Sequence, residues 1–243
     1  MTNRIALLAD IHSNLTALEA VRADMLSQGI SACILLGDII NYGPHPNEVI
    51  EMLAKFEWPV LTNIWGNHEY SVFEGHLERF STDRGRATLN YTKSQISQES
   101  FEYLSHLKKD GTDIIVIDGL SVLCIHGTLD EAYWGSFNPS TMEDERYHQF
   151  DYVLTGHSHI PHYIEHFYKC ENPDFRNRRK IVFINPGSVG QPRNHCPLAQ
   201  YGILDFPSGA YTHRCVEYDI KKEQAAFNDQ IDPFYRLRLE KGI

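Results

Sequence analysis

The sequence lacks the features of membrane proteins and of disulfide-rich proteins. No stretch of its 243 residues approaches the ~18 apolar residues that a membrane-spanning helix needs. The segment before Asp10 holds an apolar run of only five residues, too short for a signal peptide. The five cysteines are odd in number and include no close pair, which fits free thiols in a reducing compartment. We therefore expect a cytoplasmic protein that makes no membrane contact.

An excess of positive charge is also missing. Lys and Arg number 22 against 32 Asp and Glu, which gives a formal net charge of −10. Proteins that bind nucleic acid generally carry a basic stripe, so we expect no stable nucleic-acid complex. The acidic balance does not exclude a phosphate substrate, because bound metal ions would reverse the sign of the charge inside a site.

The length and the pattern of apolar runs predict one α/β domain over residues 1–243. We find no repeat and no linker, and a single α/β domain of this size is common. Short apolar runs alternate with helical patterns in the first half, which favours a largely parallel sheet covered by helices. The predicted strands are 5–8, 33–36, 60–64, 114–117, 121–125, 152–154, 181–184, 201–205 and 210–216. The predicted helices are 14–28, 48–56, 84–96 and 99–107, followed by a weakly helical tail after Lys221 that Pro233 interrupts.

Residues 70–110 differ in character from the rest of the chain. They are polar, dotted with aromatic residues and poor in strand signal. We expect this segment to form a helical cap over a site. Aromatic side chains there, such as Tyr91 and Tyr103, could stack on a nucleobase, an interaction worth ~1–3 kcal/mol per base in single-strand binders.

Polar side chains able to bind metals follow one predicted strand after another. In α/β sheets, ligands gather outside the carboxyl ends of the strands, so we expect five groups far apart in sequence to converge. The groups are Asp10 and His12, Gly37–Asp38, Gly66–Glu69 with Asn67 and His68, His126–Gly127, and Gly156–His159 with His157.

The chemistry of this set predicts a centre of two metal ions. It offers carboxylate, amide and imidazole ligands without a thiolate, which suits divalent Mn, Fe or Zn. Seven candidate ligands exceed what one ion needs and suffice for two if one carboxylate bridges them. A structural or single-metal site would need only about four ligands. Two ions ~3.5–4 Å apart are a known device for in-line attack on phosphorus, because they hold both the attacking and the departing oxygens.

The five blocks resemble the pattern of the calcineurin-like metallophosphoesterases: D-x-H, G-D, G-N-H-[DE], H and G-H-x-H. The run NPGS at Asn185–Ser188 and the run GDIINYGPHPNEVI are similar to the compact prokaryotic phosphodiesterase branch, which also includes a metal-poor scaffold subunit of retromer. The resemblance implies a four-layer α/β/β/α sandwich of two mixed sheets flanked by helices. It assigns one metal ion to Asp10, His12, Asp38 and His159. It assigns the other to Asp38, Asn67, His126 and His157, with Asp38 as the bridge. His68 is implied to be a catalytic residue near the leaving-group oxygen and not a ligand.

One departure from the family pattern concerns the substrate. The branch often carries Ser-Pro-Arg after the histidine that corresponds to His126, whereas this chain has Gly127–Asp130. A phosphate-contacting arginine is therefore missing there. Arg193 could take that role, and the alternative is that Arg193 is an ordinary surface residue.

The predicted function is a metal-dependent phosphoric ester hydrolase that cleaves phosphodiester or phosphoanhydride bonds. Nucleotides are the expected small-molecule substrates, with diadenosine polyphosphates as the specific candidate. The alternatives are a protein serine/threonine phosphatase on the same metal core and a non-catalytic scaffold on the same fold. The scaffold is disfavoured because all seven ligands and His68 are present. The oligomeric state, the metal and the exact substrate stay open at this stage.

Overall fold

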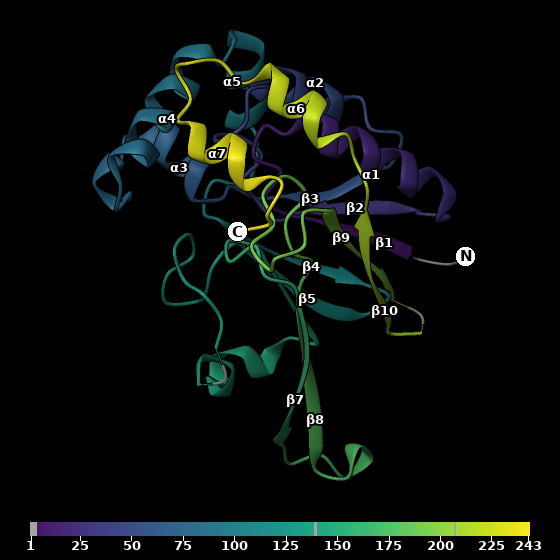
Figure 1. Ribbon diagram of the computed structural model, residues 1–243. Coiled ribbons are helices and arrows are strands. Elements are labelled where there is room, and N and C mark those ends of the chain that lie inside the picture. The colour runs from purple at the N-terminus through teal and green to yellow at the C-terminus, as the bar shows by residue number, and fades with distance from the viewer. Residues whose placement is uncertain (1–3, 139, 207) are drawn as a thin grey trace.

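The computed structural model describes residues 4–138, 140–206 and 208–243, which form two stacked five-stranded sheets with helices (Figure 1). Sheet 1 has the order β10-β9-β1-β2-β3 and sheet 2 the order β4-β5-β6-β8-β7. The strands of sheet 1 are β1 (Arg4–Leu8), β2 (Ala32–Leu35), β3 (Val60–Asn63), β9 (Ala199–Asp205) and β10 (Ala210–Val216). Those of sheet 2 are β4 (Thr112–Ile117), β5 (Leu120–Ile125), β6 (Tyr152–Thr155), β7 (His162–Lys169) and β8 (Arg178–Asn185).

Both sheets are mixed, and this confirms the predicted fold. In sheet 1, β1 pairs in parallel with β2, and β2 with β3, whereas β9 runs antiparallel to β1 and to β10. In sheet 2, β5, β6 and β8 are parallel, and the edge strands β4 and β7 are antiparallel to their neighbours. The parallel strands of each sheet therefore end at a common edge, where the chain places its polar residues.

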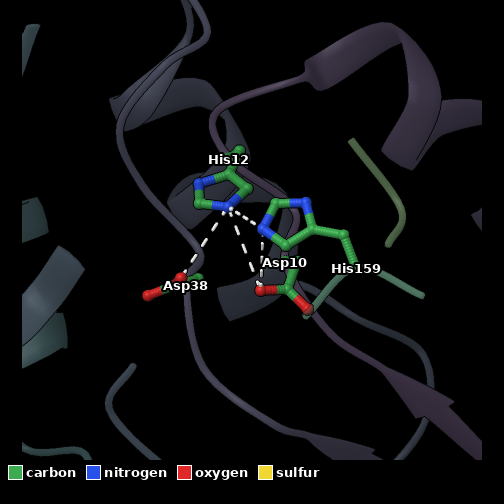
Figure 2. Close-up of side chains that lie close together, drawn as sticks. All are labelled: Asp10, His12, Asp38 and His159. Carbon is green, nitrogen blue, oxygen red and sulfur yellow. Dashed lines mark hydrogen bonds and ion pairs between the residues drawn. The ribbon is translucent and has the colours of Figure 1, made fainter. Parts of the chain in front are cut away.

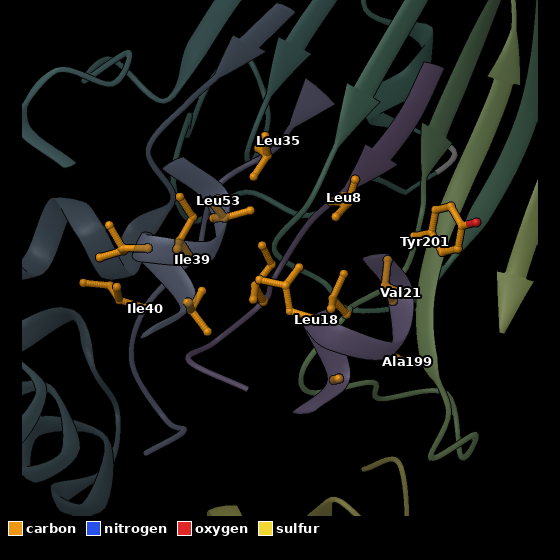
Figure 3. Close-up of a cluster of buried hydrophobic side chains, with 14 of the residues drawn as sticks. Leu8, Leu18, Val21, Leu35, Ile39, Ile40, Leu53, Ala199 and Tyr201 are labelled. Carbon is orange, nitrogen blue, oxygen red and sulfur yellow. The ribbon is translucent and has the colours of Figure 1, made fainter. Parts of the chain in front are cut away.

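Strand β1 shows why the two sheets stack. Ile5 and Leu7 point into the core between the sheets, and Ala6 and Leu8 point into the core under the helices. Side chains alternate across a strand, so a strand covered on both faces is apolar throughout. Figure 3 shows the core under the helices, where Leu18 and Val21 meet Leu8 and Tyr201.

The helices are α1 (Leu15–Ser27), α2 (Pro46–Ala54), α3 (Asn67–Glu74), α4 (Asp83–Gln95), α5 (Gln98–Ser105), α6 (Ile220–Ala226) and α7 (Pro233–Arg238). In Figure 1 they gather on the side of sheet 1. The outer face of sheet 2 is covered by the short 3₁₀ helices η2 (Thr141–Glu143) and η3 (Glu145–Gln149), which bury Met142 and Tyr147 against it. No helix among the described residues is long and apolar enough to cross a membrane.

Three elements differ from the sequence prediction. Helix α3 and strand β7 were not predicted, and Pro233 begins helix α7 instead of interrupting a helix. Proline is tolerated in the first helical turn because its missing N–H would have no partner there. Asp232 caps this helix, its side chain accepting a hydrogen bond from the Phe234 N–H at 2.8 Å.

The segment 70–110 is helical, and part of it belongs to the core. Leu89 of α4 and Leu104 of α5 are buried in the core under the helices. The hydroxyls of Tyr91 and Tyr103 accept hydrogen bonds from the side chains of Asn228 and Asn63. The hydroxyls of both tyrosines are therefore held by hydrogen bonds to other parts of the protein. The part of the segment that reaches the site is the turn 79–85 before and at the start of α4.

Candidate metal centre

The predicted ligands converge at the carboxyl-terminal edges of both sheets. Sheet 1 supplies its ligands from the loops after β1, β2 and β3, and sheet 2 supplies the others from the loops after β5 and β6. Their side chains form two groups, and within each group the ligand atoms all lie within 4.8 Å of one another. One group is Asp10, His12, Asp38 and His159 (Figure 2), and the other is Asp38, His126 and His157.

The loops that carry these residues adopt unusual backbone conformations. Asp10, His12, Asp38, His157 and His159 all have positive φ angles, between 50° and 66°. Such conformations are uncommon for residues other than glycine and cluster at functional sites. Backbone hydrogen bonds hold them, among them Asp10 N–H to Gly37 O at 3.1 Å and His12 N–H to Asp38 O at 3.0 Å.

Gly66 lets a second loop approach Asp38 closely. A Cβ atom on Gly66 would lie 2.1 Å from Asp38 Oδ1 and 2.5 Å from the Asp38 nitrogen. Only glycine can therefore occupy this position without moving the loop that carries Asp38.

The first group surrounds a small space between four side chains. His12 Nε2 lies 3.1 Å from His159 Nε2, 3.7 Å from Asp38 Oδ2 and 3.9 Å from Asp10 Oδ1. His159 Nε2 lies 3.4 Å from Asp10 Oδ1. All four side chains are buried, so water does not solvate this cluster of acceptors.

Hydrogen bonds to backbone carbonyls orient three of the imidazoles. His12 Nδ1 donates to Ile40 O at 3.1 Å, His159 Nδ1 to Gln191 O at 2.6 Å and His126 Nδ1 to Leu36 O at 2.6 Å. A ring that donates from Nδ1 turns Nε2 toward the centre, which is the usual arrangement of a metal-binding histidine.

The second group shares Asp38 with the first. Asp38 Oδ2 lies 3.2 Å from His126 Nε2. Asn67, the remaining predicted ligand, places its Oδ1 3.2 Å from His126 Nε2 and 2.9 Å from His157 Nδ1. The structure therefore brings all seven predicted ligands together.

Three carboxylate oxygens of this centre find no hydrogen-bond donor among the described residues, whereas Asp38 Oδ1 accepts from the His68 N–H at 2.9 Å. Both Oδ atoms of Asp10 and Oδ2 of Asp38 are buried and accept no hydrogen bond among the described residues. Burial, together with the charge of Asp38, raises the pKa of Asp10 to about 8 despite the opposing effect of His126. Burial would also raise the pKa of Asp38, but His126 and His68 outweigh it and lower that pKa. Buried acceptors without donors are costly, and cations would satisfy them. The donor set fits two adjacent divalent ions.

The imidazoles respond to burial in two ways. Burial lowers the pKa of His157 to about 3 and that of His68 to about 4, so both rings are neutral near pH 7. Burial acts in the same direction on His126, but the charge of Asp38 overcomes it and raises the pKa of His126 to about 9. A cation beside Asp38 would balance the charge of this carboxylate in place of the protonated His126 ring.

His68 lies beside the two groups and belongs to neither. Its Nε2 is 3.8 Å from Asp38 Oδ2, and its Nδ1 is 2.6 Å from Asn41 Nδ2. Thr92 Oγ1 donates to Asn41 Oδ1 at 3.1 Å, which turns the amide nitrogen of Asn41 toward His68. With Nδ1 accepting from Asn41, the neutral ring carries its proton on Nε2. Asn41 was not predicted to be functional, although it lies in the run GDIINYGPHPNEVI, which is similar to the compact phosphodiesterase branch.

Glu69 is the last residue of the G-N-H-[DE] block, and the sequence predicted no role for it. It is fully buried, and its two carboxylate oxygens accept four backbone N–H groups, from Asp38, Ile39, Ile40 and Gly66, at 2.8–3.1 Å. Glu69 thus ties the loop after β2 to the start of α3. The NPGS run also ties site loops together. Asn185 Nδ2 donates to Gly156 O and Ser188 Oγ donates to Asp10 O, both at 2.7 Å.

A cavity of about 190 Å³ opens onto both groups. Arg193 lines it and is half-buried, so its side chain lies beside the candidate ligands and is not freely exposed. Further lining comes from Arg79, Phe80, Trp134 and Tyr235. A larger hollow of about 830 Å³ lies at the tip of the β7–β8 hairpin, but none of the predicted ligands lines it. We place the chemistry in the smaller cavity because the buried acids and imidazoles open there.

Comparisons with known proteins agree with this geometry. The family model described as calcineurin-like phosphoesterase superfamily domain matches residues 4–209. An uncharacterized protein of Methanocaldococcus jannaschii is 33% identical over 225 residues, which cover 90% of this chain and 89% of that protein. Phosphodiesterase YfcE of Escherichia coli is 24% identical over 205 residues, 81% of this chain and 84% of YfcE. The crystal structure of a metallophosphoesterase from Sphaerobacter thermophilus superposes with a TM-score of 0.77 at 27% identity, covering 100% of both chains.

Proposed function

The chain belongs to the calcineurin-like phosphoesterase superfamily, and on that premise we propose that it hydrolyses phosphodiester or phosphoanhydride bonds in nucleotides with two divalent metal ions, Mn, Fe or Zn. The observation that carries the proposal is the set of three buried oxygens, both of Asp10 and Oδ2 of Asp38, that find no hydrogen-bond donor among the described residues. They are surrounded by imidazoles, three of which hold Nε2 toward them by donating from Nδ1 to backbone carbonyls.

The ligand assignment follows the two groups. We assign one ion to Asp10, His12, Asp38 and His159. We assign the other to Asp38, Asn67, His126 and His157. Asp38 is the bridge in this proposal because it is the member common to both groups. Bound in this way, the ions supply positive charge that polarises a phosphoryl group and offsets the charge that develops on its oxygens.

His68 is the proposed proton donor to the leaving oxygen. Its Nε2 carries the proton when Nδ1 accepts from Asn41, and the ring faces the cavity. General acid catalysis of this kind typically contributes 10²–10⁴-fold. Arg193 is the proposed contact for the substrate phosphate, because its Nε is buried without a partner among the described residues and its side chain lines the same cavity.

The cavity also bears on the choice of substrate. Its volume of about 190 Å³ is below the roughly 300–1,000 Å³ of typical small-molecule pockets. A phosphoryl group fits such a space, whereas the two nucleosides of a diadenosine polyphosphate would have to lie outside it. Of the aromatic side chains in the lining, Phe80 is buried and Trp134 is half-buried with the Arg79 guanidinium over its ring, so a base would reach the Arg79–Trp134 pair. The alternative function, a protein phosphatase, would need a wide cleft that admits a phosphoprotein. The cavity of about 190 Å³ is not such a cleft.

A hydrolysis screen tests the proposal. Metal-stripped protein is reloaded with Mn²⁺ and assayed on nucleoside mono-, di- and triphosphates, dinucleoside polyphosphates, cyclic nucleotides and a phosphopeptide, with the unloaded protein as control. We expect metal-dependent release of nucleotide products. Binding of two ions without hydrolysis of any substrate would favour the scaffold, and cleavage of the phosphopeptide alone would favour the protein phosphatase.

A further inference from the structure

The C-terminal segment contributes to the cavity although it lies outside the region that the family model matches. The matched region ends at residue 209, and helices α6 and α7 follow it. In Figure 1 these two helices lie back across the helical layer, with α7 beside α4. Two hydrogen bonds anchor the segment: the Thr16 N–H donates to Glu223 Oε2 at 3.1 Å, and the His195 N–H donates to Gly242 O at 2.8 Å.

Tyr235 of α7 lies at the end of a column of rings that leads into the metal centre. It is only 3% exposed and stacks on Tyr42, with ring centroids 4.4 Å apart and planes at 18°. Tyr42 in turn lies 4.6 Å from the ring of His12 and 4.5 Å from the ring of His68. The position of Tyr235 is therefore defined relative to the candidate ligands and to the proposed proton donor.

Tyr235 is also part of the cavity wall. Other parts of the lining come from Phe80 and Trp134, whose rings pack edge to face at 5.4 Å. These three side chains come from three distant parts of the chain and enclose the space beside the candidate ligands. Because the enclosed space is only about 190 Å³, the ring of Tyr235 takes up room that a substrate group would otherwise use.

We propose that α7 forms the size-limiting wall of the phosphate-ester site, with Tyr235 as the residue that excludes a second large organic group on the reacting phosphorus. This inference rests on the proposed function and narrows it. Phosphoanhydride ends and esters with one large substituent can present phosphorus to the centre. Diesters with two large substituents, and dinucleoside polyphosphates with them, cannot enter without displacing Tyr235, so the inference restricts the proposed diester substrates to those with one small substituent.

A purely structural role for Tyr235 makes a different prediction. If Tyr235 only supported Tyr42 and so held His68 in place, its loss would slow hydrolysis of small and large substrates alike. A size-limiting role changes the ratio between them. The ratio is therefore the quantity to measure.

The experiment uses two substrates with the same nitrophenolate leaving group. One is p-nitrophenyl phosphate, and the other is thymidine 5′-(p-nitrophenyl phosphate), which carries a nucleoside as second substituent. Wild-type protein loaded with Mn²⁺ should prefer the first. Tyr235→Ala should raise kcat/KM for the nucleoside diester relative to the monoester by at least about tenfold, a typical effect of one pocket contact.

Two variants serve as controls. Tyr235→Phe keeps the ring and should leave the ratio unchanged. Leu237→Ala removes an apolar side chain from the same helix, but Leu237 is exposed and is not part of the cavity lining. It should leave the ratio unchanged as well. Equal losses on both substrates in Tyr235→Ala, or the same change of ratio in Leu237→Ala, would overturn the proposal.

A binding measurement separates this inference from the proposed function. Trp134 lines the cavity, so its fluorescence can report binding of inorganic phosphate and of thymidine 5′-methylphosphate to metal-loaded protein, with product analysis to check that the diester stays intact during the titration. Tyr235→Ala should tighten binding of the diester relative to phosphate by a similar factor. If wild type cleaves neither nitrophenyl substrate, the proposed function fails, while this ratio still decides the role of Tyr235. An unchanged binding ratio overturns the inference even if the enzyme is active.

Discussion

Replacing Glu69 by glutamine should destabilise the protein strongly, because Glu69 is a buried acceptor for four backbone N–H groups. One carboxylate oxygen accepts from Gly66 and Asp38 at 2.8 and 2.9 Å, and the other accepts from Ile39 and Ile40 at 2.8 and 3.1 Å. Glutamine has one oxygen where glutamate has two. Whichever way the amide turns, its NH₂ group faces two N–H donors that lose their acceptor.

The magnitude follows from these two lost acceptors. A buried donor left without a partner costs ~1–3 kcal/mol, so two of them should lower the free energy of unfolding by at most about 2–6 kcal/mol, because the neutral amide also removes the buried charge that raises the pKa of Glu69. That is a large part of the ~5–15 kcal/mol that stabilises a typical domain. The loop after β2 carries Asp38, so the same change should also weaken metal binding.

Urea unfolding of the metal-free protein provides the assay, because bound ions would add their own stabilisation. Burial, followed by the charge of Asp38, raises the pKa of Glu69 to about 7, so the measurement belongs on the alkaline side of that value, where the carboxylate is ionised. Glu74→Gln is the matched control, since Glu74 is exposed on the same helix and should change stability by no more than ~0.5 kcal/mol. A Glu69→Gln protein as stable as this control would refute the reasoning.

Three further predictions concern the centre and the packing of α1. Asp38→Asn should cost at least one bound ion per chain by elemental analysis and abolish hydrolysis; two retained ions with full activity would contradict the bridging assignment. His68→Asn should keep both ions, lose about 10²–10⁴-fold in rate on nucleoside esters and much less on nitrophenyl esters, whose leaving group needs no proton; equal losses would argue against a general acid. Asp24→Asn should be destabilising near neutral pH. Burial alone would raise the pKa of Asp24, but hydrogen bonds from Arg214 and Tyr201 lower it below 3.8. The stabilisation that ionised Asp24 provides is therefore complete above pH 3.8 and is lost as the pH falls through the lower pKa of the folded state. Unfolding curves measured at several pH values should show the free energies of unfolding of wild type and variant converging in acid. A difference in free energy that does not depend on pH would refute this.

The fold was predictable where burial leaves a pattern in the sequence. Strand β1 is apolar at each position after Arg4 because both of its faces are covered, and α1 repeats apolar residues about once per turn. Strand β7 has no such pattern. Ile164 and Phe167 are exposed, so the apolar residues of β7 mark no buried face. Helix α3 begins with polar residues that serve the site, and its start depends on the bond from the Gly66 N–H to Glu69.

The same contrast applies to the site. The ligands could be proposed from sequence because the parallel strands of a sheet end at one edge, so short polar blocks after successive strands must lie near one another. The roles of Asn41 and Tyr235 depend on contacts between segments 27 and 193 residues apart, Asn41 with His68 and Tyr235 with Tyr42. No local pattern encodes such contacts. Arg193 was ambiguous for the same reason, since only the folded loop shows that it lines the cavity.

The position of the centre between the two sheets explains why bound cations would suit it. Sheet 1 supplies both aspartates and sheet 2 supplies most of the imidazoles, at the edge where the apolar core between the sheets ends. The ligand side chains at this edge are shielded from bulk solvent, because Asp10 and His126 are 0% exposed and Asp38 is 1% exposed. The carboxylate oxygens of Asp10 have no donors among the described residues. Two buried acids that lie this close must be neutralised. In the protein alone, the raised pKa values of Asp10 and His126 do so by keeping protons on these groups, and divalent ions would replace those protons with positive charge shared by both carboxylates.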